Sequence, residues 1–386
     1  MMPTERLGQL CDVLDSKRKP VTKRDRVSGP YPYYGATGVQ DYVAQYLFDE
    51  PLVLVGEDGA KWNSGDESAF AVTGKVWVNN HAHVLRPNRS RVLDKWLIYV
   101  LNYSDLTPFV SGLTVPKLNQ ASLRDIPIPL PPLEAQKRIV AILEETFDAI
   151  GTSQTSAEKN LLNAKELFES YREGILSSRC DGWLEARLGA ICDIKHGYAF
   201  EGEYFTSDGD YVLLTPGNFY ETGGYRDRGD KQKYYIGPIP DGFVLMAGDL
   251  LVAMTEQAAG LLGSPLLVPQ NNRFLHNQRL GLVVGRPSIP WHNGFFFHVF
   301  NTRRVRDEIH RSASGVKVRH TSPKKIGDVR VFFPDTVEEQ RRISESLFTV
   351  GEECKRLADI YSAKGAACDN LKASVLHRAF SGRLTA

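Results

Sequence analysis

Paired cysteines, long apolar runs and an excess of charge of one sign are all missing from this sequence. Its five cysteines include no C-x-x-C pair, which argues against a zinc ribbon and against a disulfide framework. The most apolar stretch, GFVLMAGDLLVAM, is interrupted by Asp249 and is too short to cross a membrane. No basic segment followed by an apolar one opens the chain, so we expect no secretory signal. Together these absences predict a reduced, cytoplasmic setting.

Motifs of catalysis and cofactor binding are missing as well. The sequence has no Asn-Pro-Pro-[Tyr/Phe] methyltransferase signature and no glycine-rich methyl-donor loop after a strand. The segment AVTGKV contains Gly74 and Lys75 but lacks the spacing of a phosphate-binding loop. His81 and His83 could form a metal pair, but no further ligands stand at suitable spacing. We therefore expect no catalytic, cofactor or metal site in this chain.

The net charge of +1 does not by itself indicate a nucleic-acid binder. Basic residues are nevertheless clustered. Six fall between Lys17 and Arg26, and eight fall between Arg303 and Lys325 against only two acidic residues. Such clusters are typical of a surface that binds a polyanion, and they are equally compatible with a solvated face.

The clearest positive feature is an internal repeat. Gln136, in PPLEAQKRIVAIL, stands 204 positions before Gln340, in VEEQRRISESL. The motif LGQLCDV near the start of the chain returns as LGAICDI, and SGLTVPKLN returns loosely as SGVKVRHTS. Each copy therefore contains an LG-x-[LI]-CD motif, short β-strands, an S-G segment, a proline junction and a long helix.

A long helix is predicted after each proline junction. Apolar residues recur there with heptad spacing, which predicts a coiled-coil-like helix of about 45 residues, or about 68 Å. No third partner helix is visible, so the simplest packing is of the two helices against each other. The residues of this helix-pair seam are Leu143, Phe147, Ile150, Leu161, Phe168 and Tyr171 in the first helix, and Leu347, Cys354, Tyr361, Cys368 and Val375 in the second.

The sequence thus predicts an α+β chain, a tandem pseudo-repeat of two mostly β domains separated by two long antiparallel coiled-coil helices. We name the β-rich domains head 1 (1–132) and head 2 (181–334), and the helical segments span 133–180 and 335–386. Two similar heads on a rigid helical pair predict a target with two sites at a fixed separation.

These motifs resemble those of the specificity subunits of type I restriction–modification systems. The resemblance is carried by LRDIPIPLPPLEAQKRIVAIL and by the ending LKASVLHRAFSGRL, and through the repeat it covers essentially the whole chain. The second junction departs from the family pattern, with Pro334 and Asp335 in place of the double proline, but it keeps Glu338, Glu339 and Gln340.

The resemblance implies a non-catalytic subunit with two target-recognition domains, each reading one half of a bipartite site in double-stranded DNA. It also implies that two adenine-N6 methyltransferase subunits bind to the helices and that restriction subunits can join them. These partners, and not this chain, would use S-adenosylmethionine, and ATP and Mg²⁺ for restriction. No membrane would be involved.

Candidate DNA contacts follow from side-chain chemistry. Asn and Gln pair with adenine, and Arg and Lys with guanine, so the stretches NNHAH and HNQR are expected to read bases. The loops YPYYGATG and AMTEQAAGLLG have small residues that let a backbone approach DNA, while the basic S-G loops would bind phosphates. Each stretch is also explained by an edge strand, a core cap or a solvated face. The candidates are Tyr31, Tyr33, Thr37, Lys61, Asn79, Asn80, His81, His83, Lys117, Thr255, Gln257, Asn277, Gln278, Arg279, Lys317, Arg319, His320, Lys324 and Lys325.

Three other interpretations compete with this one. A stand-alone bipartite DNA-binding regulator would bind its site tightly without a methyltransferase. An enzyme of carbohydrate or nucleotide metabolism is disfavoured by the missing catalytic residues. A purely structural coiled-coil scaffold does not explain the basic, Asn- and His-bearing heads.

Overall fold

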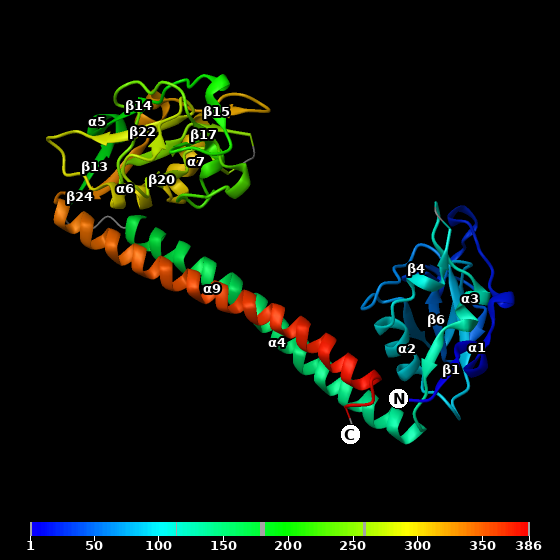
Figure 1. The fold of residues 1–386 in the computed structure, drawn as a ribbon. Helices are drawn as coiled ribbons and strands as arrows, with labels where there is room; N and C mark the ends of the chain where they lie inside the picture. The colour runs from blue at the N-terminus through cyan, green and yellow to red at the C-terminus, as the bar shows by residue number, and fades with distance from the viewer. Residues whose placement is uncertain (1, 113, 178–181, 258–259, 385–386) are drawn as a thin grey trace. The chain divides into compact units, whose positions relative to one another are not determined.

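The computed structural model describes residues 2–112, 114–177, 182–257 and 260–384. Its contacts divide the chain into unit 1, residues 1–159 with 361–386, and unit 2, residues 160–360 (Figure 1). Each unit holds one head and parts of the two long helices α4 (Leu133–Ser177) and α9 (Val337–Phe380). The predicted boundary at 180/181 lies outside the described residues.

Head 1 is built mainly from two four-stranded sheets. The first has the order β2-β9-β6-β7 and is antiparallel; the second has the order β4-β3-β8-β5 and contains a parallel pair, β3 with β8. Two-stranded pairs β1-β12 and β10-β11 accompany them. The strands are β1 (Thr4–Arg6), β2 (Cys11–Val13), β3 (Ser28–Gly35), β4 (Gly38–Val43), β5 (Phe48–Asp49), β6 (Leu52–Gly56), β7 (Ala69–Val72), β8 (Lys75–Val78), β9 (Ala82–Pro87), β10 (Val110–Ser111), β11 (Lys117–Leu118) and β12 (Pro127–Pro129), and the helices are α1 (Leu7–Leu10), α2 (Asp94–Tyr103) and α3 (Gln120–Asp125).

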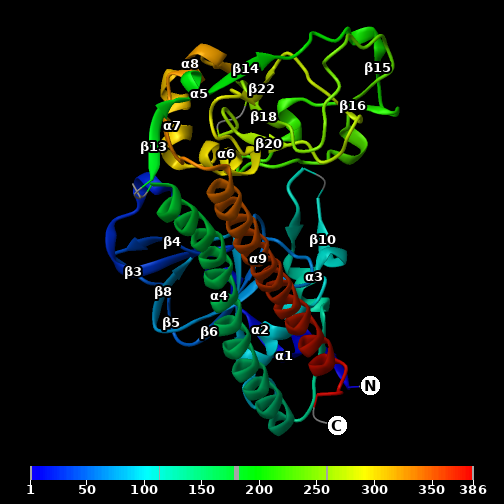
Figure 2. The ribbon, with the colours of Figure 1, turned by 90° about the vertical axis from the view of Figure 1, so that its left-hand side faces the viewer.

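Head 2 repeats this plan with a sheet of order β14-β22-β18-β20 and a second sheet of order β15-β17-β16-β21. Figure 2 shows α5, α7 and α8 beside β13, with β15 and β16 at the other end of the head. The strands are β13 (Trp183–Arg187), β14 (Cys192–His196), β15 (Phe205–Thr206), β16 (Tyr211–Leu213), β17 (Tyr234–Tyr235), β18 (Leu250–Ala253), β19 (Thr255–Glu256), β20 (Pro265–Leu267), β21 (Phe274–Leu275), β22 (Leu280–Gly285), β23 (Arg319–His320) and β24 (Arg330–Pro334), and the helices are α5 (Leu188–Ile191), α6 (Asn293–Phe300), α7 (Arg303–Ser312) and α8 (Pro323–Gly327).

Strand β6, in the middle of the first sheet of head 1, is apolar on both faces because each face packs into a hydrophobic core. All five residues of β6 are buried. Alternate side chains of a strand point to opposite faces. Accordingly Val53 and Val55 pack into one core with Trp96 of α2, whereas Leu52 and Leu54 pack into a second core with β8.

The first sheets of the two heads share their strand order and their register. Cys11 pairs with Pro87 in head 1 and Cys192 pairs with Gly285 in head 2. The second sheets differ in strand order, although each keeps one parallel pair. The two copies of the predicted repeat are therefore most alike in the first sheet and least alike in the second.

Both long helices have the predicted length, 45 residues for α4 and 44 for α9. Within each unit the two helices lie side by side and antiparallel (Figure 1). Residues later in α4 contact residues earlier in α9. The contacts are Phe147 with Lys372 and Gln154 with Asp369 in unit 1, and Phe168 with Gly351 and Tyr171 with Ser346 in unit 2.

Burial along both helices follows a seven-residue period. The buried residues of this column are Leu143, Ile150, Ala157 and Ala164 on α4 and Leu347, Cys354 and Cys368 on α9, with Tyr361 and Val375 half-buried. The remaining residues of the predicted seam are half-buried, apart from Tyr171, which is 37% exposed. No helix in the described parts of the chain is long and apolar enough to span a membrane.

Candidate nucleic-acid interface

A tight turn leads from the second sheet into the first sheet of each head. In head 1 the side-chain oxygen of Asn79 accepts the N–H of His81 at 2.8 Å, and in head 2 Asn277 accepts that of Arg279 at 3.0 Å. Asparagine favours such turns because its side chain can bond to the backbone two residues on. The turn leaves two exposed side chains in each head: Asn80 and His81, and Gln278 and Arg279.

A single backbone residue joins this turn to the S-G segment of the same head, which we name loop 1 (residues 111–119) and loop 2 (residues 314–322). In head 1 the N–H of Glu57 donates to the carbonyl of His81, and its carbonyl accepts from Leu118, both at 2.8 Å. In head 2 Met254 makes the same two bonds, to Arg279 and from Thr321, both at 3.0 Å. The turn and the loop, predicted separately, thus form one surface in each head.

The repeated S-G motif is explained by a backbone requirement. Gly112 and Gly315 both have φ of +99°, a conformation that side chains disfavour. A Cβ atom would lie 2.5 Å from the carbonyl oxygen of Val115 in loop 1 and 2.1 Å from that of Val318 in loop 2. Glycine is therefore required for both loops to close.

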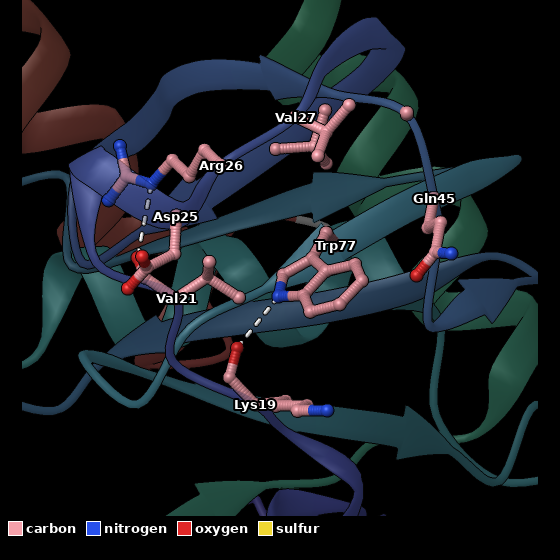
Figure 3. A pocket seen from close by; sticks show the side chains of 9 residues that line it. Lys19, Val21, Asp25, Arg26, Val27, Gln45 and Trp77 are labelled. Carbon is pink, nitrogen blue, oxygen red and sulfur yellow. Dashed lines mark hydrogen bonds between the residues drawn. The ribbon is translucent and has the colours of Figure 1, made fainter.

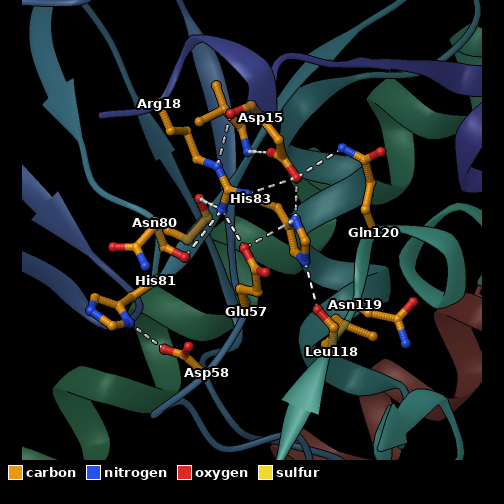
Figure 4. A network of polar contacts seen from close by, with 12 residues as sticks. Asp15, Arg18, Glu57, Asp58, Asn80, His81, His83, Leu118, Asn119 and Gln120 are labelled. Carbon is orange, nitrogen blue, oxygen red and sulfur yellow. Dashed lines mark hydrogen bonds and ion pairs between the residues drawn. The ribbon is translucent and has the colours of Figure 1, made fainter. Parts of the chain in front are cut away.

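A buried charge network lies beneath loop 1 (Figure 4). Arg18 pairs with Glu57 and lies 3.3 Å from Asp15. The ammonium of Lys117 reaches Glu57 at 2.8 Å, and His83 lies 2.5 Å from Asp15. The ammonium of the basic side chain of loop 1 is therefore held by a buried carboxylate.

The network keeps its carboxylates charged. Burial alone would raise the pKa of Glu57, but hydrogen bonds from Lys117 and Arg18 outweigh burial and lower that pKa. Burial would also raise the pKa of Asp15. The hydrogen bond from His83 to Asp15, together with the charge interaction between these two residues, outweighs burial and lowers that pKa. The hydrogen bond between Lys117 and Glu57 also raises the pKa of Lys117.

Asp15, Glu57 and His83 offer ligand atoms that all lie within 4.8 Å of one another, a spacing that a metal ion could bridge. Both carboxylates already pair with cations, however, Asp15 with Arg18 and Glu57 with Arg18 and Lys117. A metal ion would have to displace these groups. We interpret the cluster as a salt-bridge network that orients loop 1.

Loop 2 is held in the same way by different residues. The guanidinium of Arg319 lies 3.3 Å from Glu256, which is 2% exposed, and also donates to the carbonyl of His310. The hydroxyl of Thr255 and the Nδ1 atom of His320 are 3.2 Å apart. The residue of head 2 that matches Glu57 by its backbone bonds is Met254, so the tethering carboxylate stands at a different position in each head.

A cavity of about 470 Å³ lies beside the head 2 turn. Its lining includes Thr255, Gln257 and Arg279, together with Arg228 and Lys233, and it includes no acidic side chain among the described residues. Arg228 and Lys233 were not expected from the sequence. They lie in the segment YRDRGDKQKYY, where neighbouring aspartates offset part of the positive charge, so the segment does not stand out as basic. Three basic groups around one cavity suit a polyanion.

Head 1 has a smaller cavity, of about 270 Å³, over Trp77 (Figure 3). The indole N–H of Trp77 donates to the carbonyl of Lys19 at 2.7 Å, and Arg26 lies 4.1 Å above the Tyr33 ring. The basic cluster at residues 17–26 is therefore divided in the structure. Lys19 and Arg26 line this cavity, whereas Arg18 belongs to the buried network.

Comparison with known proteins gives a match to one domain model and several similar proteins. The type I restriction modification DNA specificity domain matches residues 2–164, which cover head 1 and the first part of α4. Over nearly their whole length, type I restriction enzyme specificity subunits are similar to this chain. A Haemophilus influenzae protein with the provisional name of a type I restriction enzyme specificity subunit is 27% identical over 354 residues, covering 88% of this chain and 85% of that one. A type I restriction enzyme specificity subunit of Methanocaldococcus jannaschii is 21% identical over 402 residues, covering 98% and 92%.

Two solved structures share the fold. A chain from a structural study of type I restriction–modification complex assembly has a TM-score of 0.70 and 18% identity, with 100% of both chains covered. The HsdS subunit from Thermoanaerobacter tengcongensis has a TM-score of 0.61 and 18% identity, covering 99% of this chain and 97% of that one.

A side chain that contacts DNA must be exposed, and five of the predicted contacts are buried. They are Tyr33, Asn79, His83, Thr255 and Asn277, which are 1%, 2%, 0%, 8% and 9% exposed. The Tyr33 ring stacks on Trp77, and both ring nitrogens of His83 are engaged, with Asp15 and with the Leu118 carbonyl. In the structure these side chains lie inside the heads, where they support the surface from within.

The two histidines of the possible metal pair, His81 and His83, lie in different elements. Strand β9 begins at Ala82, so His81 lies in the preceding turn, where it pairs with Asp58. The remaining predicted contacts are spread around the heads. Thr37, Lys61, Lys317 and Lys324 are exposed, Tyr31 packs edge-on against Tyr46, and Lys325 reaches Ser314 of loop 2 at 3.4 Å.

Proposed function

We propose that this chain is the non-catalytic DNA-specificity subunit of a type I restriction–modification complex. Each head reads one half of a bipartite site in double-stranded DNA. The observation that carries the proposal is the repetition at the heads, where one backbone residue, Glu57 or Met254, joins a turn with two exposed side chains to a basic loop. One framework that presents different side chains suits a target with two different halves.

Within each head the turn and the loop have different roles. The turn residues, Asn80 and His81 or Gln278 and Arg279, carry groups that can pair with base edges in the major groove. The lysines and arginines of the loops bind phosphates, which positions the protein without selecting sequence. The basic cavity beside the head 2 turn extends the phosphate-binding surface.

Helices α4 and α9 pair as an antiparallel coiled coil that separates the heads. The support is the seven-residue period of burial and the antiparallel contacts within each unit. Apolar side chains also remain exposed on both helices, namely Leu162, Leu167, Ile360 and Leu371, each at least 50% exposed. These side chains offer a surface for two adenine-N6 methyltransferase subunits, and restriction subunits join that assembly. The partners use S-adenosylmethionine, and ATP and Mg²⁺ for restriction.

The proposal is tested by exchanging one head. Residues 183–333 are replaced by the corresponding head of another family member, and the chain is expressed with its methyltransferase partner. Because β13 and β24 pair with each other inside head 2, the exchange leaves head 1 intact. We expect sequencing of methylated adenines to show a change in one half of the motif only.

Three outcomes contradict the proposal. A change in both halves, or in neither, means that the heads do not read separate half-sites. Tight binding of the purified chain to a bipartite site, with no methylation in the presence of the partner, identifies a stand-alone regulator instead. The wild-type chain with and without the methyltransferase serves as the control.

A further inference from the structure

Each head is fastened to its long helix by one buried glutamine. In unit 1 the side-chain amide of Gln136 donates to the carbonyl oxygens of Arg91 at 2.9 Å and Pro131 at 2.8 Å. Its carbonyl oxygen accepts the N–H of Leu93 at 2.9 Å. The side chain is 0% exposed. A residue of α4 thus bonds both to the proline junction and to the segment that precedes α2.

Gln340 repeats this arrangement in unit 2. Its amide donates to the carbonyl oxygens of Pro290 and Pro334, both at 3.0 Å, and its oxygen accepts the N–H of His292 at 2.8 Å. It too is 0% exposed. The second junction lacks the double proline of the first, yet the three bonds are the same. The two junctions therefore share the glutamine and one proline carbonyl that accepts its bond, and not the double proline.

A glutamine side chain is well suited to this place because it carries two donors and an acceptor on one planar group. Apolar packing also joins head and helix, for example Ile139 and Leu143 of α4 with Trp96 in unit 1. Apolar contacts are non-directional, whereas hydrogen bonds require defined distances and angles. The two glutamines therefore fix the angle of each head on its helix.

We propose that the glutamine clamps at Gln136 and Gln340 determine which gap between the half-sites the protein accepts. The proposal rests on the proposed function, since the angle of a head matters to DNA only if that head reads a half-site. Both glutamines are buried and act through the heads that they hold. They are positioning residues for recognition and make no contact with DNA.

The test uses Gln136→Glu and Gln340→Glu in the full chain, expressed with the methyltransferase partner. Glutamate keeps the shape but loses both donors, and its carboxylate then faces two carbonyl oxygens. We expect both half-sites to stay unchanged. Methylation of sites with a gap one base pair longer or shorter should rise at least about tenfold, because each variant loses two donated hydrogen bonds and the loss of one is on the order of that factor.

Matched variants separate positioning from stability. Val53→Ala truncates the buried centre of β6, far along the chain from the clamp, and lowers the stability of head 1 without removing a clamp bond. It should reduce the amount of methylation and leave the gap unchanged. Gln136→Met and Gln340→Met keep the side-chain volume without polar atoms, so the test stays decisive if the buried carboxylate prevents folding.

The outcomes are distinguishable. If the wild type methylates a bipartite motif and the glutamate and methionine variants keep the same gap, the clamp proposal is overturned. The proposed function then still stands. A gap relaxed equally by Val53→Ala also overturns it, because general loss of stability would then be the cause. Absence of any bipartite motif from the wild type overturns the proposed function itself.

Discussion

At the scale of single residues, His298 of α6 stands out because it is buried without a polar partner. It is 1% exposed and packs against the rings of Phe348 and Phe168. Neither ring nitrogen has a hydrogen-bond partner among the residues that the structure describes. Burial, helped by repulsion from Arg172, lowers the pKa of His298 to about 3.

This histidine should make head 2 sensitive to mild acid. Its pKa in the folded state lies below the value of about 6.5 in an unfolded chain, so the unfolded chain binds the proton first and stability is lost as the pH falls below about 6.5. The cost at pH 5 is about 2 kcal/mol. We expect His298→Phe to remove this loss, and to be neutral or stabilising by about 1 kcal/mol at pH 7.

The measurement is urea denaturation of the full chain at pH 7 and pH 5, with proteolysis of head 2 as the readout, since it follows the opening of that head. His276, whose pKa is lowered to about 4 mainly by burial, leaves a residual pH dependence in the variant. Replacement of the exposed His377, which belongs to unit 1 and bonds with Tyr103, by Gln is the control and should leave the pH dependence of head 2 unchanged. An unchanged difference between the two pH values in His298→Phe would show that the imidazole is accommodated in its charged form.

At the scale of elements, the two S-G loops share one construction, in which a buried carboxylate holds a basic side chain. Glu57 holds Lys117 in loop 1, and Glu256 holds Arg319 in loop 2. A carboxylate so placed orders the loop before DNA arrives and reduces the charge available to a phosphate. The neighbouring lysines of loop 2 and α8 have more freedom, since Lys317 and Lys324 are exposed.

Lys117 of loop 1 and the Lys324–Lys325 pair of α8 should act through phosphates. We expect Lys117→Ala, and the double variant Lys324→Ala with Lys325→Ala, to weaken binding to all DNA sequences by similar factors. Removing one lysine–phosphate interaction should reduce the slope of log affinity against log salt by about one. The change should be smaller for Lys117, because Glu57 already neutralises part of its charge.

The experiment is a salt titration of binding to cognate and unrelated duplexes by the chain with its methyltransferase partner. Lys95, which pairs with Glu144 of α4 outside the loops, provides the control substitution to alanine. If cognate binding falls while binding to unrelated DNA holds, these lysines read bases and the assignment to phosphates is wrong.

At the scale of the whole molecule, the proposed helical pair should determine the distance between the half-sites. Inserting seven residues after Ser156 in α4 and after Ile360 in α9 preserves the heptad phase and lengthens each helix by about 10.5 Å. This corresponds to about three base pairs at about 3.4 Å each. We expect the methylated motif to keep both half-sites and to gain about that many base pairs in its gap.

Two companion variants sharpen this measurement. Four-residue insertions at the same points disturb the heptad phase and rotate one head against the other, so they should be tolerated less well than their length suggests. An insertion into α4 alone leaves the two helices mismatched and should abolish methylation. An active double seven-residue variant that still methylates the original spacing would show that the helices do not set the gap.

The sequence alone was sufficient for features that depend on local pattern. Heptad spacing predicted helices of about 45 residues, and α4 and α9 have 45 and 44. The recurrence of S-G predicted matching loops, and a positive φ at Gly112 and Gly315 explains it. Both features follow from periodicity or from the φ of one residue, which neighbours in the chain suffice to specify.

Tertiary structure alone decided which polar side chains face outward and which are held inside. Asn79 and Asn80 are identical in chemistry and adjacent in sequence, yet the first is buried in a turn and the second is exposed. Asp15 and His83 bond across 68 positions of sequence, and Gln136 bonds back to Arg91 across 45. Such partners meet only after strands have paired in register and the head has packed onto its helix, so no local pattern could reveal them.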